Sequence, residues 1–205
     1  MPRDKRNMQH LRASVAAAAA RLIAEDGLLD FALAKRKAAR QLGLEALHVL
    51  PDNDEVEEAL RVHQSLYQDE EHQECLRELR EEALEVMEFL ASFRPYVRGG
   101  VLKGTAGRYS GIDLQVFAED SKALEIFLLN NDISFELQPS RRDPGTPVFA
   151  LDWDGTAVKV AVHPLNEERI VAANGKAAER MNLKAFRGLL AAETAAAEEE
   201  EGKAL

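Results

Sequence analysis

The sequence predicts an α+β fold, in which a helical N-terminal half packs on a smaller domain with a mixed β-sheet. Apolar residues recur at helical spacing in four segments before Pro95, whereas strand-like alternation and glycine-rich turns appear only after it. With 205 residues and a hydrophobic content of 46%, the chain can bury a substantial core. We expect a helical domain over 1–95, an α/β domain over 96–193 and an acidic, disordered or frayed helical tail over 194–205.

The first two helices are predicted by their apolar stripes and by the glycines that follow them. Apolar residues from Met8 to Glu25 recur at helical spacing, and Asp26-Gly27 ends that helix. The second helix covers about Phe31 to Leu42 and ends at Gly43. Its basic residues lie largely outside its apolar side: Lys35, Arg36, Lys37 and Arg40.

Charge is distributed unevenly along the chain. Residues 1–44 contain nine Lys and Arg against four acids, a net charge of +5, which leaves −15 for the rest of a chain with a formal charge of −10.

The first two predicted helices resemble the opening of a bacterial helix-turn-helix regulator, although the segment from Leu44 to Asn53 contains Pro51 and supplies no recognition helix. Nucleic acid is therefore a candidate partner, but a solvated basic face is the more common explanation of such a charge run.

Two further helices complete the N-terminal half. Asp52 or Asn53 is expected to cap the third helix, whose apolar stripe continues to Tyr67. The fourth helix covers about Glu70 to Phe93, and its near-heptad stripe fits antiparallel packing against the third.

The cysteine content and the apolar runs indicate the compartment. Cys75 is the only cysteine, which excludes an internal disulfide and fits a reducing environment. His72 lies three residues before it, but zinc normally needs three or four ligands, so we do not expect a metal there. No run is long enough to span a bilayer and the N-terminus lacks the apolar core of a signal peptide, so we expect a cytoplasmic protein without membrane partners.

The sheet domain is expected to begin with two strands joined by a glycine-rich loop. Val97 to Lys103 is predicted as the first strand, Gly104 to Tyr109 as a loop or short helix, and Gly111 to Phe117 as the second strand. Asp120 or Ser121 then caps a helix that ends near residue 129.

The rest of the domain is predicted to hold three strands and two helices. A strand covers Ile133 to Leu137, and a hairpin pairs Val148 to Trp153 with Thr156 to His163 around an Asp154-Gly155 turn. Arg141 and Arg142 lie in the loop between them. Helical segments follow at about Gly175 to Met181 and at Leu183 to Ala192, the second one capped by Asn182.

Glycine, hydroxyl and carboxylate groups converge only between Gly99 and Phe117. Five glycines occur in the first thirteen positions, and the strand that follows turns Ile112, Leu114 and Val116 inward and Asp113 outward. Flexible glycine loops can approach phosphates, and carboxylates hold magnesium. This combination predicts a site for a phosphate-bearing ligand.

The order of these residues resembles the nucleotidyltransferase superfamily over roughly residues 97–162. In that family a Gly-Ser or Gly-Thr pair follows one strand and Ser-Asp-hydrophobic-Asp begins the next, and here Gly104-Thr105 and Ser110-Gly111-Ile112-Asp113 occupy those places. Gly111 stands where the family has its first carboxylate. If the alignment is right, Gly111→Asp would restore a metal pair with Asp113 on one strand face.

The resemblance implies roles for individual residues. Gly104, Thr105 and Ser110 would hold the phosphates of a nucleoside triphosphate, with Lys103 and Arg108 to neutralise their charge. Asp113 would bind Mg²⁺ and act in catalysis together with Asp152.

Each carboxylate also has a structural interpretation. Asp152 and Asp154 are common residues of a hairpin turn, and Asp113 could accept backbone hydrogen bonds from Gly104 to Gly107.

The sequence thus favours a nucleotidyltransferase-like protein that binds a nucleotide and has an incomplete carboxylate set. Whether it transfers a nucleotide stays open, because two metal ions need acids from at least two sides. The alternative is a non-catalytic regulatory or binding protein, whose N-terminal helices contact nucleic acid or a protein partner. A third possibility is a helical scaffold that keeps only the fold.

Overall fold

The computed structural model describes residues 2–44, 50–67, 69–139, 145–169 and 180–203. Helices and a mixed sheet make up this part of the chain, which confirms the α+β class. Contacts divide the chain into residues 1–76 with 107–110, called the helical unit here, and residues 77–106 with 111–205, called the sheet unit. The predicted domain boundaries stay predictions. Among the described helices, none has the length and apolar character needed to cross a bilayer.

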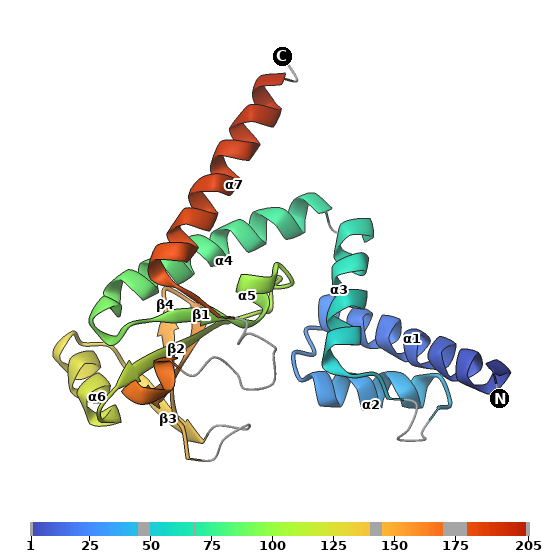
Figure 1. The fold of residues 1–205 in the computed structure, drawn as a ribbon, viewed down its shortest axis with the longest axis horizontal. Helices are drawn as coiled ribbons and strands as arrows, with labels where there is room; N and C mark the ends of the chain where they lie inside the picture. Colours follow the sequence, from blue (N-terminus) through green and yellow to red (C-terminus); the bar gives the residue numbers. More distant parts are fainter. Residues whose placement is uncertain (1, 45–49, 68, 140–144, 170–179, 204–205) are drawn as a thin grey trace. The chain divides into compact units, whose positions relative to one another are not determined.

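The helical unit contains α1 (Pro2–Ala24), α2 (Phe31–Gln41), α3 (Asn53–Tyr67) and the first part of α4 (Asp69–Phe89) (Figure 1). These bounds confirm the four predicted N-terminal helices, except that the fourth ends at Phe89 instead of near Phe93. The core of the unit is built mainly from α1 and α2, and six of its eleven buried residues are alanines, which let the helices pack closely. Those buried residues are Val15, Ala16, Ala19, Ala20, Leu22, Ile23, Ala34, Ala38, Ala39, Val56 and Leu60.

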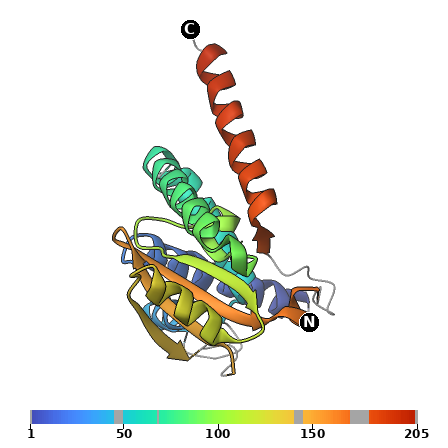
Figure 2. The ribbon, with the colours of Figure 1, turned by 90° about the vertical axis from the view of Figure 1, so that its left-hand side faces the viewer.

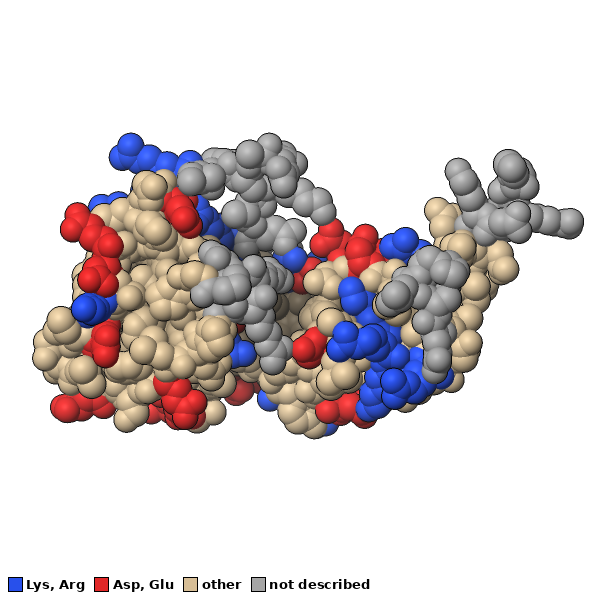
Figure 3. Space-filling view, turned by 90° about the horizontal axis from the view of Figure 1, so that it is seen from below, with Lys and Arg blue, Asp and Glu red and all other residues tan. Residues whose placement is uncertain are grey.

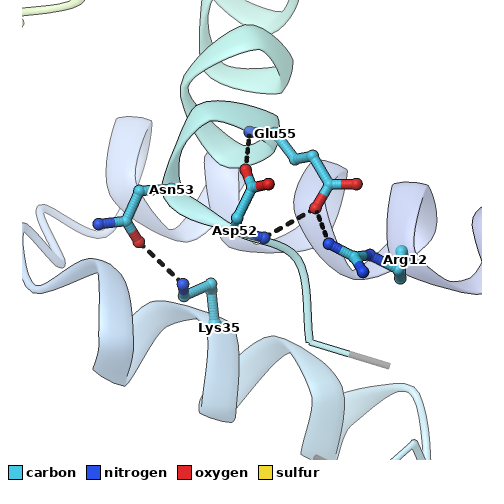
Figure 4. A network of polar contacts seen from close by, with 5 residues as sticks. All are labelled: Arg12, Lys35, Asp52, Asn53 and Glu55. Atoms are coloured by element: carbon cyan, nitrogen blue, oxygen red, sulfur yellow. Dashed lines mark hydrogen bonds and ion pairs between the residues drawn. The ribbon is translucent and has the colours of Figure 1, made fainter. Parts of the chain in front are cut away.

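Side chains fix where α2 and α3 begin. Asp30 caps α2 by accepting hydrogen bonds from two backbone N–H groups of its first turn. At the start of α3, Asp52 accepts from the Glu55 N–H at 2.8 Å while Glu55 accepts from the Asp52 N–H at 2.7 Å (Figure 4). This reciprocal pair confirms Asp52 as the cap. Arg12 of α1 pairs with the same Glu55 carboxylate, so the cap also ties α3 to α1.

Gly27 lies in the turn between α1 and α2 and has a backbone conformation that favours glycine. Its φ is +67°, and a Cβ placed on it would lie 2.9 Å from Cγ of the Tyr109 ring, which belongs to the same unit. Gly43, after α2, has the same left-handed backbone at φ +68° but open space around it. The two glycines therefore differ only in the ring contact.

This difference predicts unequal costs for the same substitution. We expect Gly43→Ala to lower the free energy of unfolding by about 1 kcal/mol, because alanine is strained in the left-handed region. Gly27→Ala should cost at least about 1 kcal/mol more, because the new methyl overlaps the Tyr109 ring. Urea unfolding of both variants measures the difference, and equal losses would contradict the ring contact.

The sheet unit holds six described strands in the order β3-β4-β5-β2-β1-β6. β2 and β5 pair in parallel and the other neighbours pair antiparallel, so the sheet is mixed as predicted. The strands are β1 (Tyr96–Arg98), β2 (Ile112–Ala118), β3 (Phe135–Pro139), β4 (Pro147–Trp153), β5 (Thr156–Pro164) and β6 (Arg180–Asn182). The helices are the rest of α4, α5 (Gly99–Lys103), α6 (Ser121–Asn130), α7 (Leu183–Lys203) and two short 3-10 helices, η2 (Ala91–Phe93) and η3 (Leu165–Arg169).

Helices supply the apolar cover for one face of this sheet. Phe89 of α4 contacts the rings of Phe127 on α6 and of Trp153 on β4, at centroid distances of 5.0 and 5.2 Å. Arg187 of α7 pairs with Glu88 of α4, which places α7 beside α4 (Figures 1 and 2). The strand residues that face these helices, including Ile112, Leu114 and Val116, are buried, as predicted from their alternation.

The predicted first strand is wrong beyond Arg98. Residues Gly99–Lys103 form the short helix α5 instead of continuing the strand. Gly99 has φ +70°, which interrupts an extended chain, and Gly104 ends α5 in the left-handed conformation at φ +78°. The glycines that suggested a flexible loop therefore shape one helical turn.

The other predicted elements of this unit are largely confirmed. Asp120 caps α6 by accepting from the Lys122 N–H, and Asn182 caps α7 by accepting from the Ala185 N–H. The β4–β5 hairpin turns at Asp154 and Gly155, both with positive φ.

One expected element near the end of the chain is wrong. Met181, expected at the end of a helix, lies in β6 and pairs with Val97 of β1, because residues 180–182 extend the sheet. The rest of that expected helix, and Arg141 and Arg142, lie outside the described residues. Helix α7 continues to Lys203, through most of the expected tail.

Candidate functional site

The face of the sheet opposite the helices carries the Asp113 side chain. Because register partners point to the same face, the pairings of β2 identify its neighbours there. In the strand register, Asp113 lies opposite Arg98 on β1 and opposite Lys159 on β5. All three side chains are partly or fully accessible: Arg98 and Asp113 are half-buried and Lys159 is exposed. Asp113 therefore lies in one row between two cations, called the Arg98–Asp113–Lys159 row here.

Gly99 makes room for the Asp113 carboxylate. A Cβ placed on Gly99 would lie 3.1 Å from Asp113 Oδ2, which is closer than an ordinary carbon contact. The positive φ of Gly99 and this close approach both require glycine at the position. The carboxylate consequently sits against the backbone where α5 begins.

The backbone of the glycine turn is already bonded internally. The N–H groups of Gly104, Thr105 and Ala106 all donate to the carbonyl oxygen of Gly100. The Gly107 N–H donates to Ser110 Oγ at 3.0 Å. The predicted bonds from these four amides to Asp113 are therefore wrong, and the same amides do not form a phosphate cradle.

The predicted phosphate-binding side chains fall into different parts of the structure. Thr105 is only 6% exposed, so its hydroxyl is not available to a ligand from solvent. Lys103 ends α5 in the sheet unit. Arg108 and Ser110 belong to the helical unit, where the Arg108 guanidinium lies 4.7 Å from the Tyr109 ring centroid and 4.0 Å from Glu71.

Gly111 cannot carry the missing carboxylate on this backbone. A Cβ placed on it would lie 2.4 Å from the carbonyl oxygen of Ala157, an atom of the β5 backbone that has no freedom to swing away. The expected gain of a metal pair from Gly111→Asp is therefore wrong: any side chain here forces β2 and β5 apart.

Asp152 takes its structural role in the hairpin. Its Oδ1 accepts the Gly155 N–H at 3.0 Å, which stabilises the turn. It points to the same face as Asp113, but it pairs with Ala157 and sits on β4, so β5 separates the two carboxylates. Two strand spacings alone amount to about 10 Å, which is too far for one shared metal ion.

These placements do not fit the magnesium site that the family resemblance implies. Magnesium uses one or two protein carboxylates in near-octahedral geometry. Here Asp113 is flanked by cations, Asp152 is bonded to its own turn, and Gly111 has no space for an acid. In the described part of the chain no three His, Cys, Asp or Glu residues gather closely enough to hold a metal.

Sequence reasoning missed Arg98 and Lys159 as site residues. Both alternate with buried neighbours, Val97 on β1 and Val158 and Val160 on β5, which was a signal that they point away from the core. Their position beside Asp113 depends on the strand order, and the sequence alone does not give it.

Arg180 and Glu168 contact aromatic side chains on the same sheet face, at Tyr96 of β1 and Phe117 of β2. Arg180 lies over the rings of Tyr96 and Phe117, at 4.8 and 5.0 Å from their centroids. Glu168 on η3 accepts from the Tyr96 hydroxyl and pairs with Arg94 at 2.7 Å. Burial, reinforced by the negative charge of Glu168, raises the pKa of Tyr96 above the ordinary value of 10.0.

No protein-family model and no curated protein matches the chain. A search of solved structures finds a cytoplasmic RNA terminal U-transferase that is 19% identical, with a TM-score of 0.32. The match covers 50% of this chain, and it spans only 34% of the U-transferase chain. A similarity this low adds no evidence on the activity of this protein.

The Gly111 contact predicts a large loss of stability from a small substitution. Gly111→Ala should lower the free energy of unfolding by about 1–3 kcal/mol, because the methyl overlaps the Ala157 carbonyl. Gly188→Ala in α7 is the control, because open space surrounds that position and alanine favours a helix, so it should gain up to about 1 kcal/mol. Thermal unfolding compares them, and a neutral Gly111→Ala would show that β2 and β5 are not this close.

The raised pKa of Tyr96 predicts a loss of stability at high pH. The unfolded chain ionises this tyrosine near pH 10, whereas the folded protein holds the proton to higher pH, so its contribution is complete below pH 10 and falls as pH rises through the folded pKa. Tyr96→Phe should therefore lose less stability than the wild type between about pH 10 and 12. Tyr109→Phe, at an exposed tyrosine, is the control. Parallel curves for Tyr96→Phe and wild type would contradict the assignment.

Proposed function

We propose that this chain is a nucleotidyltransferase-like protein that binds the phosphates of a nucleotide without a metal ion and does not transfer the nucleotide. The observation that carries the proposal is the Arg98–Asp113–Lys159 row. Two cations around one carboxylate give this part of the sheet face a net positive charge. A phosphate can bridge Arg98 and Lys159, which lie on either side of Asp113 in the strand register.

The chemistry of the row favours an anion over a metal ion. A divalent metal at Asp113 would lie beside two positive charges, and the repulsion opposes its binding. A phosphate is attracted by the same two cations, because guanidinium and ammonium groups both form charge-assisted hydrogen bonds to phosphate oxygens. The same residues that weaken the magnesium hypothesis therefore support phosphate binding.

Transfer is not part of the proposal because its chemical requirements are missing from the described residues. Nucleotidyl transfer by two metal ions needs carboxylates that stabilise the attacking and the leaving oxygens together. The turn residues that would cradle a triphosphate use their amides on Gly100 and Ser110 instead. The nucleotide is then a ligand, and the protein acts by binding it.

The proposal predicts that ATP binds in the presence of EDTA. Lys159→Gln should weaken this binding about tenfold, since a hydrogen bond to a charged group contributes about 1.5–3 kcal/mol and the lower end applies at an exposed residue. Asp113→Asn should not weaken it and is expected to strengthen it, because it removes the one negative charge of the row. Isothermal titration calorimetry measures each affinity.

Lys122→Gln, which removes an exposed lysine of α6 in the same unit, is the matched control and should bind as the wild type does. Binding that requires Mg²⁺ and disappears in Asp113→Asn would instead establish a metal site. No heat with any nucleotide would remove nucleotide binding altogether.

A further inference from the structure

Helix α2 presents two different sides. Ala34, Ala38 and Ala39 are buried in the core of the helical unit. The opposite side carries Leu33, Arg36, Lys37 and Arg40, which follow the spacing i, i+3, i+4, i+7 and so form one stripe along the helix. All four are exposed, Leu33 by 44%. We call Arg36, Lys37 and Arg40 the basic α2 surface.

Little negative charge offsets this surface. Helix α2 contains no acidic residue. Lys37 pairs with Asp26 at 3.2 Å, but both side chains are about half exposed, so the pair is weak and a ligand can compete for it. Lys35 points elsewhere, because its Nζ donates to Asn53 Oδ1 at the start of α3 (Figure 4). Figure 3 shows Lys and Arg side chains gathered over this part of the helical unit.

We propose that the basic α2 surface binds the phosphate backbone of a nucleic acid, at a site separate from the Arg98–Asp113–Lys159 row. Arg36 and Arg40 stand one turn apart, so they reach along the helix like a short line of cations, and successive phosphates form the complementary line of anions. An acidic protein partner fits less well, because stable protein interfaces have an apolar centre poor in charge, and this stripe has one leucine among three cations.

The neighbouring helix limits how the nucleic acid is read. The first turn of α3 is acidic, with Asp54 and Glu55, and it follows Asp52 directly. Such a helix start repels phosphates and cannot enter a groove as a recognition helix. Contact is therefore restricted to the backbone, and binding is expected to be independent of base sequence.

The test measures binding of a short fluorescein-labelled DNA duplex and of a labelled poly(U) RNA by fluorescence anisotropy. Three phosphate contacts give a slope of about −2.7 for log K against log salt on a duplex, so affinity should rise about 40-fold when salt falls from about 200 to 50 mM. The triple variant Arg36→Gln, Lys37→Gln, Arg40→Gln should lose at least tenfold in affinity at low salt, with a correspondingly smaller slope. Glutamine is a good helix former, and circular dichroism checks that α2 stays folded.

The matched control removes three exposed arginines from other helices: Arg21→Gln, Arg61→Gln and Arg77→Gln. It changes the net charge equally and should retain the wild-type slope. Equal losses in both triple variants would overturn the proposal, because only net charge would matter. Poly-glutamate that binds as tightly as DNA would also overturn it in favour of an acidic protein. The triple variant of the basic α2 surface should bind ATP in EDTA as tightly as the wild type does, which separates this site from the proposed nucleotide site.

Discussion

The parallel pairing of β2 with β5 is the constraint on which the candidate site depends. It places Lys159 beside Asp113 and brings the Ala157 carbonyl against Gly111. The register places a cation on the strand next to the carboxylate, and the Ala157 carbonyl leaves no space for a further carboxylate two residues earlier. One backbone register thus explains both why the acid pair is incomplete and why the surrounding charge is positive. Gly99 adds the space in which the Asp113 carboxylate rests.

A left-handed backbone or a close approach, rather than flexibility, accounts for Gly99, Gly100, Gly104 and Gly111. Gly100 accepts three N–H bonds at its carbonyl, and a Cβ on it would lie 3.1 Å from the Ala106 nitrogen. A turn this tight leaves its amides no outward donors for a ligand. Function on this sheet face consequently falls to side chains of the strands, which are rigidly placed by the hydrogen bonds of the sheet.

The sequence was sufficient wherever the signal was local. Periodic apolar residues predicted the N-terminal helices, and cap residues such as Asp120 and Asn182 predicted where later helices begin. The Asp154-Gly155 turn predicted the hairpin for the same reason. Local signals failed at Gly99, where a run of strand-forming residues hid a left-handed residue that starts a helical turn. The candidate site depends on pairing between distant segments, so Arg98 and Lys159 had no local pattern that joined them to Asp113.

Mapping a nucleotide onto the sheet by NMR tests the central claim most directly. With ATP added in EDTA, the account predicts that the amide signals of Arg98, Asp113 and Lys159 shift most, while those of Gly104 to Gly107 change little because their hydrogen bonds stay internal. The opposite pattern would contradict it: shifts confined to the glycine turn, and only when Mg²⁺ is present, would mean that the turn opens to hold a metal-bound triphosphate.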